Sequence, residues 1–403
     1  MQSYHKGTQL QRSALVLNYS GDFLEAYNRL KAGGPEFYFA QRYTVDSACR
    51  LKDRFEDVTI VDCKSDHVHE TRLDNGILVI GLGLTGVVKD SEIVKRIRRL
   101  NPTHIFLRFV HLGVLYWAIK KCKNVFVISP TSIVERSSLK GWVRKKLFLW
   151  LLNSKPIQCI SVYGIDASKT FAKLGVKPSK IVPHDYFYFE EKVIYEPKPL
   201  PDQSVTKLVF IGYLTEPKGI ADVISAVDTL NKQGVDVRLS IVGKGSGTRY
   251  QDLVTSLKLD DKIHFAGMLE NDKLEDYIRQ HDALLVPSHH SYPEGFPIVI
   301  SHALRARVPV LASDHPMFRN VLIHKETALV SKAGDASSIA ENILLLRSDK
   351  EFYRKATENA PEVLKNLRLP VQVGEVFDAA FNGPDGEKFL KSYSLAEYDY
   401  DAP

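Results

Sequence analysis

Short apolar runs alternate with segments of helical periodicity along most of the chain. Apolar runs such as residues 14–17 are separated by stretches such as residues 165–174, in which apolar side chains recur every three or four positions. Because strands that alternate with helices form parallel sheets, this order predicts a mostly parallel sheet covered by helices on both faces. The strands expected in the first half of the chain are residues 14–17, 37–39, 58–61, 77–80, 105–107, 125–128 and 159–162.

A proline-rich polar stretch interrupts this alternation near residue 200. Pro197, Pro199 and Pro201 remove backbone donors and oppose regular structure. The alternation of strands and helices then restarts at residue 208, so the chain holds a second α/β unit. We therefore predict an N-terminal domain over residues 1–195, a linker over residues 196–206, a C-terminal domain over residues 207–370, and a C-terminal helix and tail over residues 371–403.

Composition narrows the class of protein. The 403 residues are 44% hydrophobic and 25% charged, which is typical of a globular chain with two cores. No apolar run approaches the roughly 20 residues of a membrane-spanning helix, and the polar N-terminus lacks the apolar core of a signal peptide, so we expect a cytoplasmic protein. A net charge of +6 without a nucleic-acid-binding motif argues against a nucleic-acid partner. The four scattered cysteines indicate no metal site.

The most informative stretch runs from residue 284 to residue 304. An apolar run ends there, a polar loop carries Glu294, a Gly295-Phe296-Pro297 turn follows, and a helical pattern begins. The backbone N–H groups at a helix start suit a phosphate, and an ionised Glu294 accepts hydrogen bonds from sugar hydroxyls. The stretch predicts a site for an anionic, hydroxyl-rich ligand. The alternative is a strand, a turn and a buried helix with Glu294 in solvent.

Three further glycine loops follow predicted strands. Gly212 and Lys218 lie in the first, where the lysine and the amides of the next helix could hold a diphosphate; a surface lysine is the alternative. Gly243 lies in the second loop and permits a close backbone approach, although a simple tight turn explains it equally well. Gly267 in the third loop could place backbone groups at the edge of a base, or merely end a strand.

The order of these segments from residue 207 to about residue 347 resembles the donor domain of retaining GT-B glycosyltransferases of family 4 (glycosyl transferases group 1). The segments that carry the resemblance are Gly212-Tyr213-Leu214-x-x-x-Lys218-Gly219, Val242-Gly243-x-Gly245, Phe265-x-Gly267, Pro287-Ser288, Tyr292-Pro293-Glu294-Gly295-Phe296-Pro297 and Pro309-Val310-Leu311-Ala312-Ser313-Asp314.

This resemblance implies two Rossmann-like parallel-sheet domains that face each other across a cleft. It also implies a nucleotide-diphosphate sugar donor, such as a UDP-sugar, and transfer with retention of configuration and without a metal or other cofactor. Lys218 would contact the diphosphate and Glu294 the sugar hydroxyls. The remaining donor-site positions implied are the Phe296 and Pro297 amides at the sugar or phosphate, Gly267, Met268 and Leu269 at the base, and Gly212, Tyr213, Gly243 and Gly295 in the loops around them.

Three positions depart from the family pattern. Tyr213 replaces a usual arginine, which removes a fixed charge from the diphosphate site. His302 replaces the glutamate that usually grips the ribose, and could still make one hydrogen bond. His315-Pro316 replaces a glycine pair. These departures leave two alternatives open: a nucleotide-sugar-binding protein without turnover, and a sugar epimerase of the same architecture.

The first domain carries fewer signals. His111 follows a predicted strand where the family often shows a histidine, so it is a candidate catalytic residue beside the sugar or the acceptor; a capping or core histidine is the alternative. Residues 139–152 combine basic residues, aromatics and leucines within one helical length. Such a segment could lie on an anionic membrane, as a lipid-linked rather than a saccharide acceptor would require, or pack as an ordinary helix. Membrane association is therefore left open.

Overall fold

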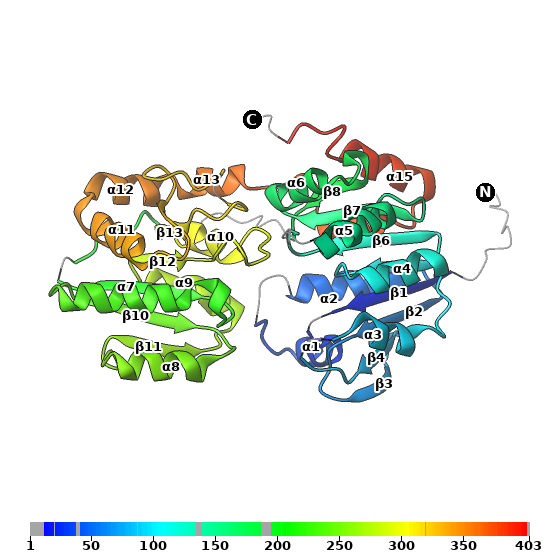
Figure 1. Ribbon diagram of the computed structural model, residues 1–403, viewed down its shortest axis with the longest axis horizontal. Helices are drawn as coiled ribbons and strands as arrows, with labels where there is room; N and C mark the ends of the chain where they lie inside the picture. The colour runs from blue at the N-terminus through cyan, green and yellow to red at the C-terminus, as the bar shows by residue number, and fades with distance from the viewer. Residues whose placement is uncertain are drawn as a thin grey trace, which may run out of the picture. The chain divides into compact units, whose positions relative to one another are not determined.

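The computed structural model divides the chain into two compact units. The first comprises Met1–Gly34, Ala40–Tyr188 and Leu369–Ala402, and the second comprises Pro35–Phe39 and Phe189–Arg368. Figure 1 shows the helices of each unit packed around its own sheet. The structure describes residues 12–19, 21–37, 41–86, 88–133, 139–186, 195–202, 204–318 and 320–400.

An eight-stranded sheet forms the centre of the first unit, in the order β3-β4-β2-β1-β5-β6-β7-β8. All neighbouring strands pair in parallel except β3 with β4. The chain therefore runs outward from β1 in one direction and then, from β5 on, in the other. The strands are β1 Ser13–Asn18, β2 Asp57–Asp62, β3 Val68–Arg72, β4 Leu78–Leu82, β5 His104–Leu107, β6 Asn124–Ser129, β7 Ile157–Tyr163 and β8 Ile181–His184.

The helices of the first unit include two from the end of the chain. Val376, Phe377 and Leu390 are buried in the same core as Val16 and Phe106. The segment expected to form a separate helix and tail is thus part of the first hydrophobic core. The helices are α1 Phe23–Lys31, α2 Gln41–Cys49, α3 Asp90–Ile97, α4 Leu112–Lys121, α5 Leu139–Leu152, α6 Ile165–Leu174, α14 Val373–Ala379 and α15 Gly383–Ser392, with 3-10 turns η1 Arg50–Asp53 and η2 Pro178–Lys180.

A six-stranded, fully parallel sheet forms the centre of the second unit, in the order β11-β10-β9-β12-β13-β14. This is the doubly wound order in which the direction of winding reverses between the first and fourth strands. The strands are β9 Thr206–Ile211, β10 Val237–Val242, β11 Ile263–Gly267, β12 Ala283–Val286, β13 Val310–Ser313 and β14 Leu329–Ser331.

Helices pack against this second sheet through apolar stripes. In α7, for example, Ile220, Val223, Ile224, Val227 and Leu230 are fully buried at the three- and four-residue spacing of one helix face. The helices are α7 Ile220–Lys232, α8 Gly247–Ser256, α9 Leu274–Arg279, α10 Ile298–Arg305, α11 Ala336–Ser348, α12 Lys350–Glu358 and α13 Ala360–Asn366, with 3-10 turns η3 Glu216–Lys218 and η4 Asn271–Lys273.

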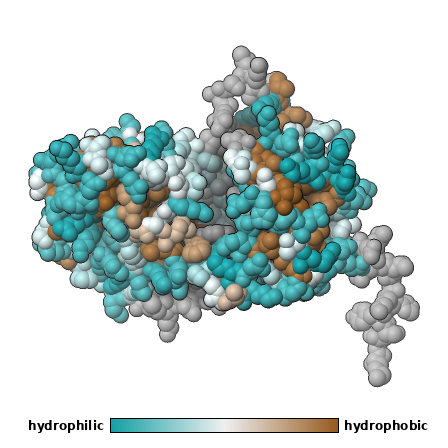
Figure 2. Space-filling model, turned by 90° about the horizontal axis from the view of Figure 1, so that it is seen from below, coloured by the Kyte–Doolittle hydropathy of each residue, from teal (hydrophilic) through white to brown (hydrophobic). Residues whose placement is uncertain are grey.

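The prediction of two parallel α/β units is confirmed. One expected strand is absent from the part that is described, because Phe37 lies in a bend, and residues 38–39 lie outside the described residues. The surface of the molecule seen in Figure 2 is mainly hydrophilic, with hydrophobic residues gathered in patches. Within the described residues, none of the helices has both the length and the apolar character needed to cross a bilayer.

Candidate functional site

The candidate site of the second unit lies beyond the ends of its two central strands. β9 and β12 are neighbours in the sheet, and the winding direction reverses between them. In open α/β sheets, ligands bind beyond the carboxyl ends of the strands at such a reversal. The loop after β9 leads to Lys218, and the loop after β12 leads to Glu294.

Close packing holds these two loops together. Gly219 has a φ of +73°, and a Cβ atom there would lie 2.2 Å from the carbonyl oxygen of Pro287. His289 donates its backbone N–H to the carbonyl of Pro217 at 2.8 Å. Only glycine tolerates both this conformation and this contact, so Gly219 is what lets Lys218 approach the second loop.

Lys218 and Glu294 form an ion pair. Their Nζ and Oε1 atoms are 2.5 Å apart, and the two side chains are only 16% and 8% exposed. Ser288 donates its hydroxyl to the same Oε1 at 2.7 Å, and the ammonium also lies 4.4 Å from the centroid of the Tyr292 ring. The structure thus brings the two predicted residues together in a sheltered site. Sequence analysis gave Ser288 no role, although its position two residues after the end of β12 was a signal.

Hydrogen bonds from buried polar side chains hold the loop after β12 in place. Ser313 donates its hydroxyl to the carbonyl of Ser288 at 2.6 Å. His315 Nδ1 accepts the N–H of Met317 at 3.2 Å, so its Nε2 carries the proton and donates to the carbonyl of Tyr292 at 3.1 Å. Burial lowers the pKa of His315. Burial, together with the nearby Glu294, raises the pKa of Tyr292 to about 12. Both side chains are therefore neutral near pH 7. His315 therefore acts here as a support for the loop.

Three predicted glycines lie side by side at the ends of neighbouring strands. Gly212 donates its N–H to Val242 at 3.0 Å, and Gly243 donates to the carbonyl of Gly267 at 2.8 Å. Gly243 has a φ of +144°, and a Cβ atom there would lie 1.8 Å from the carbonyl oxygen of Gly212. The structure therefore requires glycine at position 243 for the fold itself, whatever its role toward a ligand.

The exposed ends of these loops carry other predicted positions. Tyr213 is 52% exposed and Met268 is 42% exposed, so both side chains are accessible to a ligand. Leu269 follows Met268 in the same loop and is half-buried. A planar base could cover such apolar side chains. Their contact with a base stays a prediction.

Two predicted positions are restricted in what they can offer a ligand. Pro297 is the N-cap of α10, and proline has no N–H, so it cannot donate to a phosphate; its carbonyl accepts the N–H of Ile300 at 2.9 Å. Donation at this turn falls to its neighbours Gly295 and Phe296. His302 is 2% exposed, and its Nδ1 lies 3.2 Å from Glu275 Oε1, which Arg305 also contacts at 2.7 Å. A ribose hydroxyl would have to compete with Glu275 for that nitrogen.

In the first unit, His111 lies at the corresponding reversal of the sheet, between β1 and β5. Its Nδ1 is 3.0 Å from Asp90 Oδ1, and Gly113 donates its N–H to Asp90 Oδ2 at 2.7 Å. The imidazole ring packs 4.4 Å from the ring of Tyr19 and 4.9 Å from that of Phe109, measured between centroids. Asp90 therefore fixes the ring and leaves Nε2 available. Sequence analysis did not identify Asp90.

Among the described residues, no group of three or more His, Cys, Asp or Glu side chains is arranged to hold a metal ion. The candidate site contains the sheltered ion pair of Lys218 with Glu294 described above. An arrangement of one ammonium, one carboxylate and nearby backbone amides suits a ligand that carries both phosphate and hydroxyl groups.

Comparison with known proteins relates the stretch that contains this site to a described protein family. Residues 194–363 match the family model described as Glycosyl transferases group 1. N-acetyl-alpha-D-glucosaminyl L-malate synthase of Bacillus anthracis is 25% identical over 195 residues, which are 46% of this chain and 50% of that protein. A phosphatidyl-myo-inositol mannosyltransferase of Mycobacterium leprae is 31% identical over 157 residues, which are 38% of this chain and 41% of that protein. The matched stretch thus spans half or less of these relatives' length.

Solved structures resemble a larger part of the chain. Sucrose-phosphate synthase from Thermosynechococcus elongatus superposes with a TM-score of 0.63 and 15% identity, over 88% of this chain and 94% of that one. HepE from Anabaena, solved in complex with UDP-glucose, gives a TM-score of 0.62 and 14% identity, over 94% and 99% of the two chains. At these identities the likeness shows a shared two-unit fold.

Proposed function

Because this chain carries a domain of the glycosyl transferases group 1 family over residues 194–363, we propose that it is a retaining glycosyltransferase. It would move a hexose from a nucleotide-diphosphate sugar to a saccharide or lipid-linked acceptor. The observation that carries this proposal is the ion pair of Lys218 and Glu294 at the reversal of the second sheet. Both residues lie inside the stretch that matches the family.

Lys218 is suited to the diphosphate. Its ammonium has three donors, so it can keep Glu294 as a partner and still donate to a phosphate oxygen. A charge-assisted bond of this kind contributes about 1.5–3 kcal/mol. It contributes more as charge grows on the departing diphosphate, which is how a fixed cation lowers the barrier to transfer without a metal ion.

Glu294 is suited to the sugar. Its Oε1 already accepts from Lys218 and Ser288, which holds the carboxylate in one orientation. The second oxygen, Oε2, can then accept from a hydroxyl of the hexose. The carboxylate would orient the anomeric carbon toward the acceptor, and orientation of this kind supplies a large part of many rate enhancements.

UDP-glucose is the donor we propose to test first. The support is the solved complex of HepE with UDP-glucose, whose fold this chain shares. The exposed Tyr213 and Met268 offer apolar surface for a base. The experiment uses a panel of nucleotide sugars that differ in both the sugar and the base.

The experiment incubates the full chain with labelled UDP-, GDP- and ADP-sugars and a mixture of saccharide and lipid-linked acceptors, and follows the label into product. We expect transfer from one donor class, and a loss of about 100-fold or more in the variants K218M and E294Q. K232M is the matched control, because Lys232 pairs with Asp228 on the surface of the same unit at 2.7 Å. Undiminished transfer by K218M or E294Q would overturn the residue assignment.

A nucleotide-sugar-binding protein without turnover is the second candidate. The observation in its favour is the engagement of His302 with Glu275, which leaves the usual ribose carboxylate without a direct replacement at that position. Titration calorimetry separates the two functions, because donor binding without transfer or hydrolysis on any acceptor would favour the binding protein. Conversion of the donor into an epimer without an acceptor would instead identify an epimerase.

A further inference from the structure

Helix α5 of the first unit exposes an apolar stripe to solvent. Val143 and Trp150 are each 62% exposed, and Leu147 is 43% exposed. These residues are four and three positions apart, so they lie on one face of the helix. Leu152, which lies about half a turn around the helix from this line, and Leu151 are fully buried in the unit. The α5 apolar stripe, defined here as Val143, Leu147 and Trp150, is therefore additional to the face that α5 uses for packing.

Basic residues lie on both sides of the α5 apolar stripe. At 100° per residue, Arg144 and Lys146 fall on opposite flanks of the line through Val143, Leu147 and Trp150. Both basic residues are exposed, and the sequence of α5 contains no aspartate or glutamate. The exposed surface of this helix thus combines an apolar centre with a positive border.

The neighbouring helix α4 extends this surface. Tyr116 is 49% exposed, and the Nζ of Lys120 lies 5.8 Å from the centroid of its ring. Helices α4 and α5 pack against each other within the first unit. Tyrosine, tryptophan and lysine together are typical of side chains that lie at a membrane–water interface, because each has an apolar body and a polar end.

From this surface we propose that α5 docks the protein on an anionic lipid bilayer, with the α5 apolar stripe inserted at the level of the headgroups. A bilayer with anionic lipids supplies both an apolar layer for the stripe and negative charge for its basic border. A second copy of this chain paired through the same face would bring Arg144 and Lys146 of both copies together, and such like charges repel. Charge complementarity therefore favours a membrane over self-association.

Docking on a bilayer would add to the proposed function, and only its biological role depends on that function. If the chain transfers a hexose, docking on a bilayer favours a lipid-linked acceptor over a free saccharide. The docking itself needs no catalysis. Vesicle binding measured without any donor therefore fails or succeeds independently of the transferase assay.

The test sediments the full chain with vesicles of phosphatidylcholine, either alone or mixed with phosphatidylglycerol. We expect binding to the anionic vesicles, weakened by salt, and little binding to the neutral ones. Tryptophan fluorescence should be quenched by brominated lipids, and this quenching should be weaker in W150F. Equal binding to both vesicle types, or no binding to either, would overturn the proposal.

Variants assign the binding to α5. We expect V143S/L147S/W150S and R144Q/K146Q each to reduce vesicle binding by about tenfold or more. L344S is the apolar control, because Leu344 is 39% exposed on α11 of the second unit, and K232Q is the charge control. Unchanged vesicle binding by both α5 variants would refute the assignment. So would light scattering that showed a dimer in the wild type and a monomer in the triple variant.

Discussion

At the scale of single residues, the Asp90 carboxylate of the first unit orients another side chain. Asp90 contacts the imidazole of His111 with one oxygen and the N–H of Gly113 with the other. Because the hydrogen bond to Asp90 occupies Nδ1, the tautomer with a free Nε2 is favoured. Asp90 is thus a positioning residue for His111, which would hydrogen-bond the sugar or the acceptor.

We predict that D90N lowers the turnover number of transfer by about tenfold or more and leaves the KM for the donor nearly unchanged, because the proposed donor contacts belong to the second unit. Steady-state kinetics with the donor that the transfer assay selects would measure both constants. E92Q is the matched control, since Glu92 is an exposed carboxylate in the first turn of the same helix. A wild-type turnover number in D90N would show that His111 needs no partner.

Sequence analysis predicted the residue types of the site better than their partners. Lys218 and Glu294 were chosen because each follows a strand, and the structure places them in contact across 76 positions of sequence. Ser288 and Asp90 were missed because a hydroxyl or a carboxylate gains its role only from what folds beside it. Local pattern carries no information about such long-range partners.

At the scale of elements, the start of α7 depends on a glycine in close contact with the next loop. We predict that G219A destabilises the second unit by more than G234A and abolishes donor binding, because its Cβ would collide with the carbonyl of Pro287. Gly234 has a similar φ of +82° but open space around it, so G234A measures only the strain of a left-handed residue, about 1–2 kcal/mol. Denaturant unfolding and calorimetry with the donor check the two variants. Equal effects would mean that the contact relaxes at little cost.

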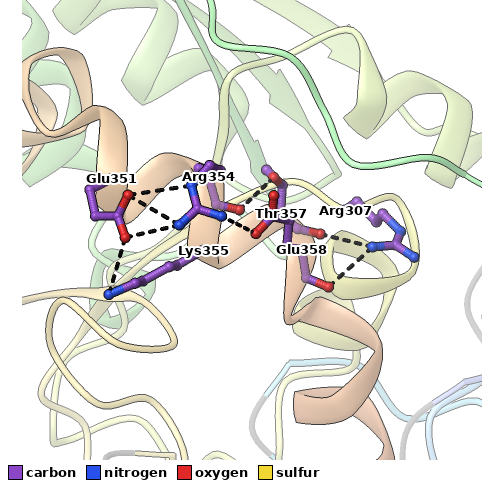
Figure 3. A network of polar contacts seen from close by, with 6 residues as sticks. All are labelled: Arg307, Glu351, Arg354, Lys355, Thr357 and Glu358. Atoms are coloured by element: carbon purple, nitrogen blue, oxygen red, sulfur yellow. Dashed lines mark hydrogen bonds and ion pairs between the residues drawn. The ribbon is translucent and has the colours of Figure 1, made fainter.

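Two arginines make different kinds of contact at helix α12 (Figure 3). Arg354 pairs with Glu351 and Glu358 on the surface of the helix, where solvent screens the charges. Arg307 instead donates to the carbonyls of Thr357 and Glu358 in the last turn, at 3.2 Å each. Cations at a helix C-terminus satisfy carbonyls that have no partner within the helix.

We therefore predict that R307A destabilises the second unit by about 1–2 kcal/mol, whereas R354A changes its melting temperature little. Thermal and denaturant unfolding of both variants, each repeated in high salt, would measure the difference. If R354A proved the more harmful change, the surface network rather than the end of the helix would be the stabilising feature.

The elements themselves were largely predictable from periodicity. Parallel strands buried on both faces give short apolar runs, and these marked β1, β2 and β9 correctly. The antiparallel edge strand β3, Val-His-Glu-Thr-Arg, was missed because it is mostly polar. Helix α15 was missed because it begins with Gly383-Pro384, which is typical of a turn.

At the scale of the whole molecule, acid should weaken the first unit through a buried histidine. His184 is fully buried beside Ser161, and burial, with a smaller effect of Arg108, lowers its pKa from 6.5 to about 3. Below pH 6.5 the unfolded chain therefore binds a proton at His184, whereas the folded unit keeps this imidazole neutral until the pH approaches 3. Stability from this group is complete above pH 6.5 and falls as the pH drops toward 3.

We predict that the wild type loses about 2 kcal/mol relative to H184Q between pH 7 and about pH 5. Hydrogen exchange of the β7 and β8 amides would measure this in the first unit alone. Burial also raises the pKa of Asp62 to about 6, which acts in the opposite direction, but comparison with H184Q cancels that contribution. H264Q, a change at an exposed histidine, is the control. A difference that does not depend on pH would show that His184 is protonated in the folded protein.

The return of residues 369–402 to the first unit has a consequence for how the protein is made. When the chain has been synthesised up to residue 368, every strand of both sheets is present. Helices α14 and α15 are still missing from the first core. The second unit can fold at that moment, while the first still exposes the apolar surface that Val376, Phe377 and Leu390 will cover. The half of the protein that is synthesised first is therefore the half whose hydrophobic core is completed last.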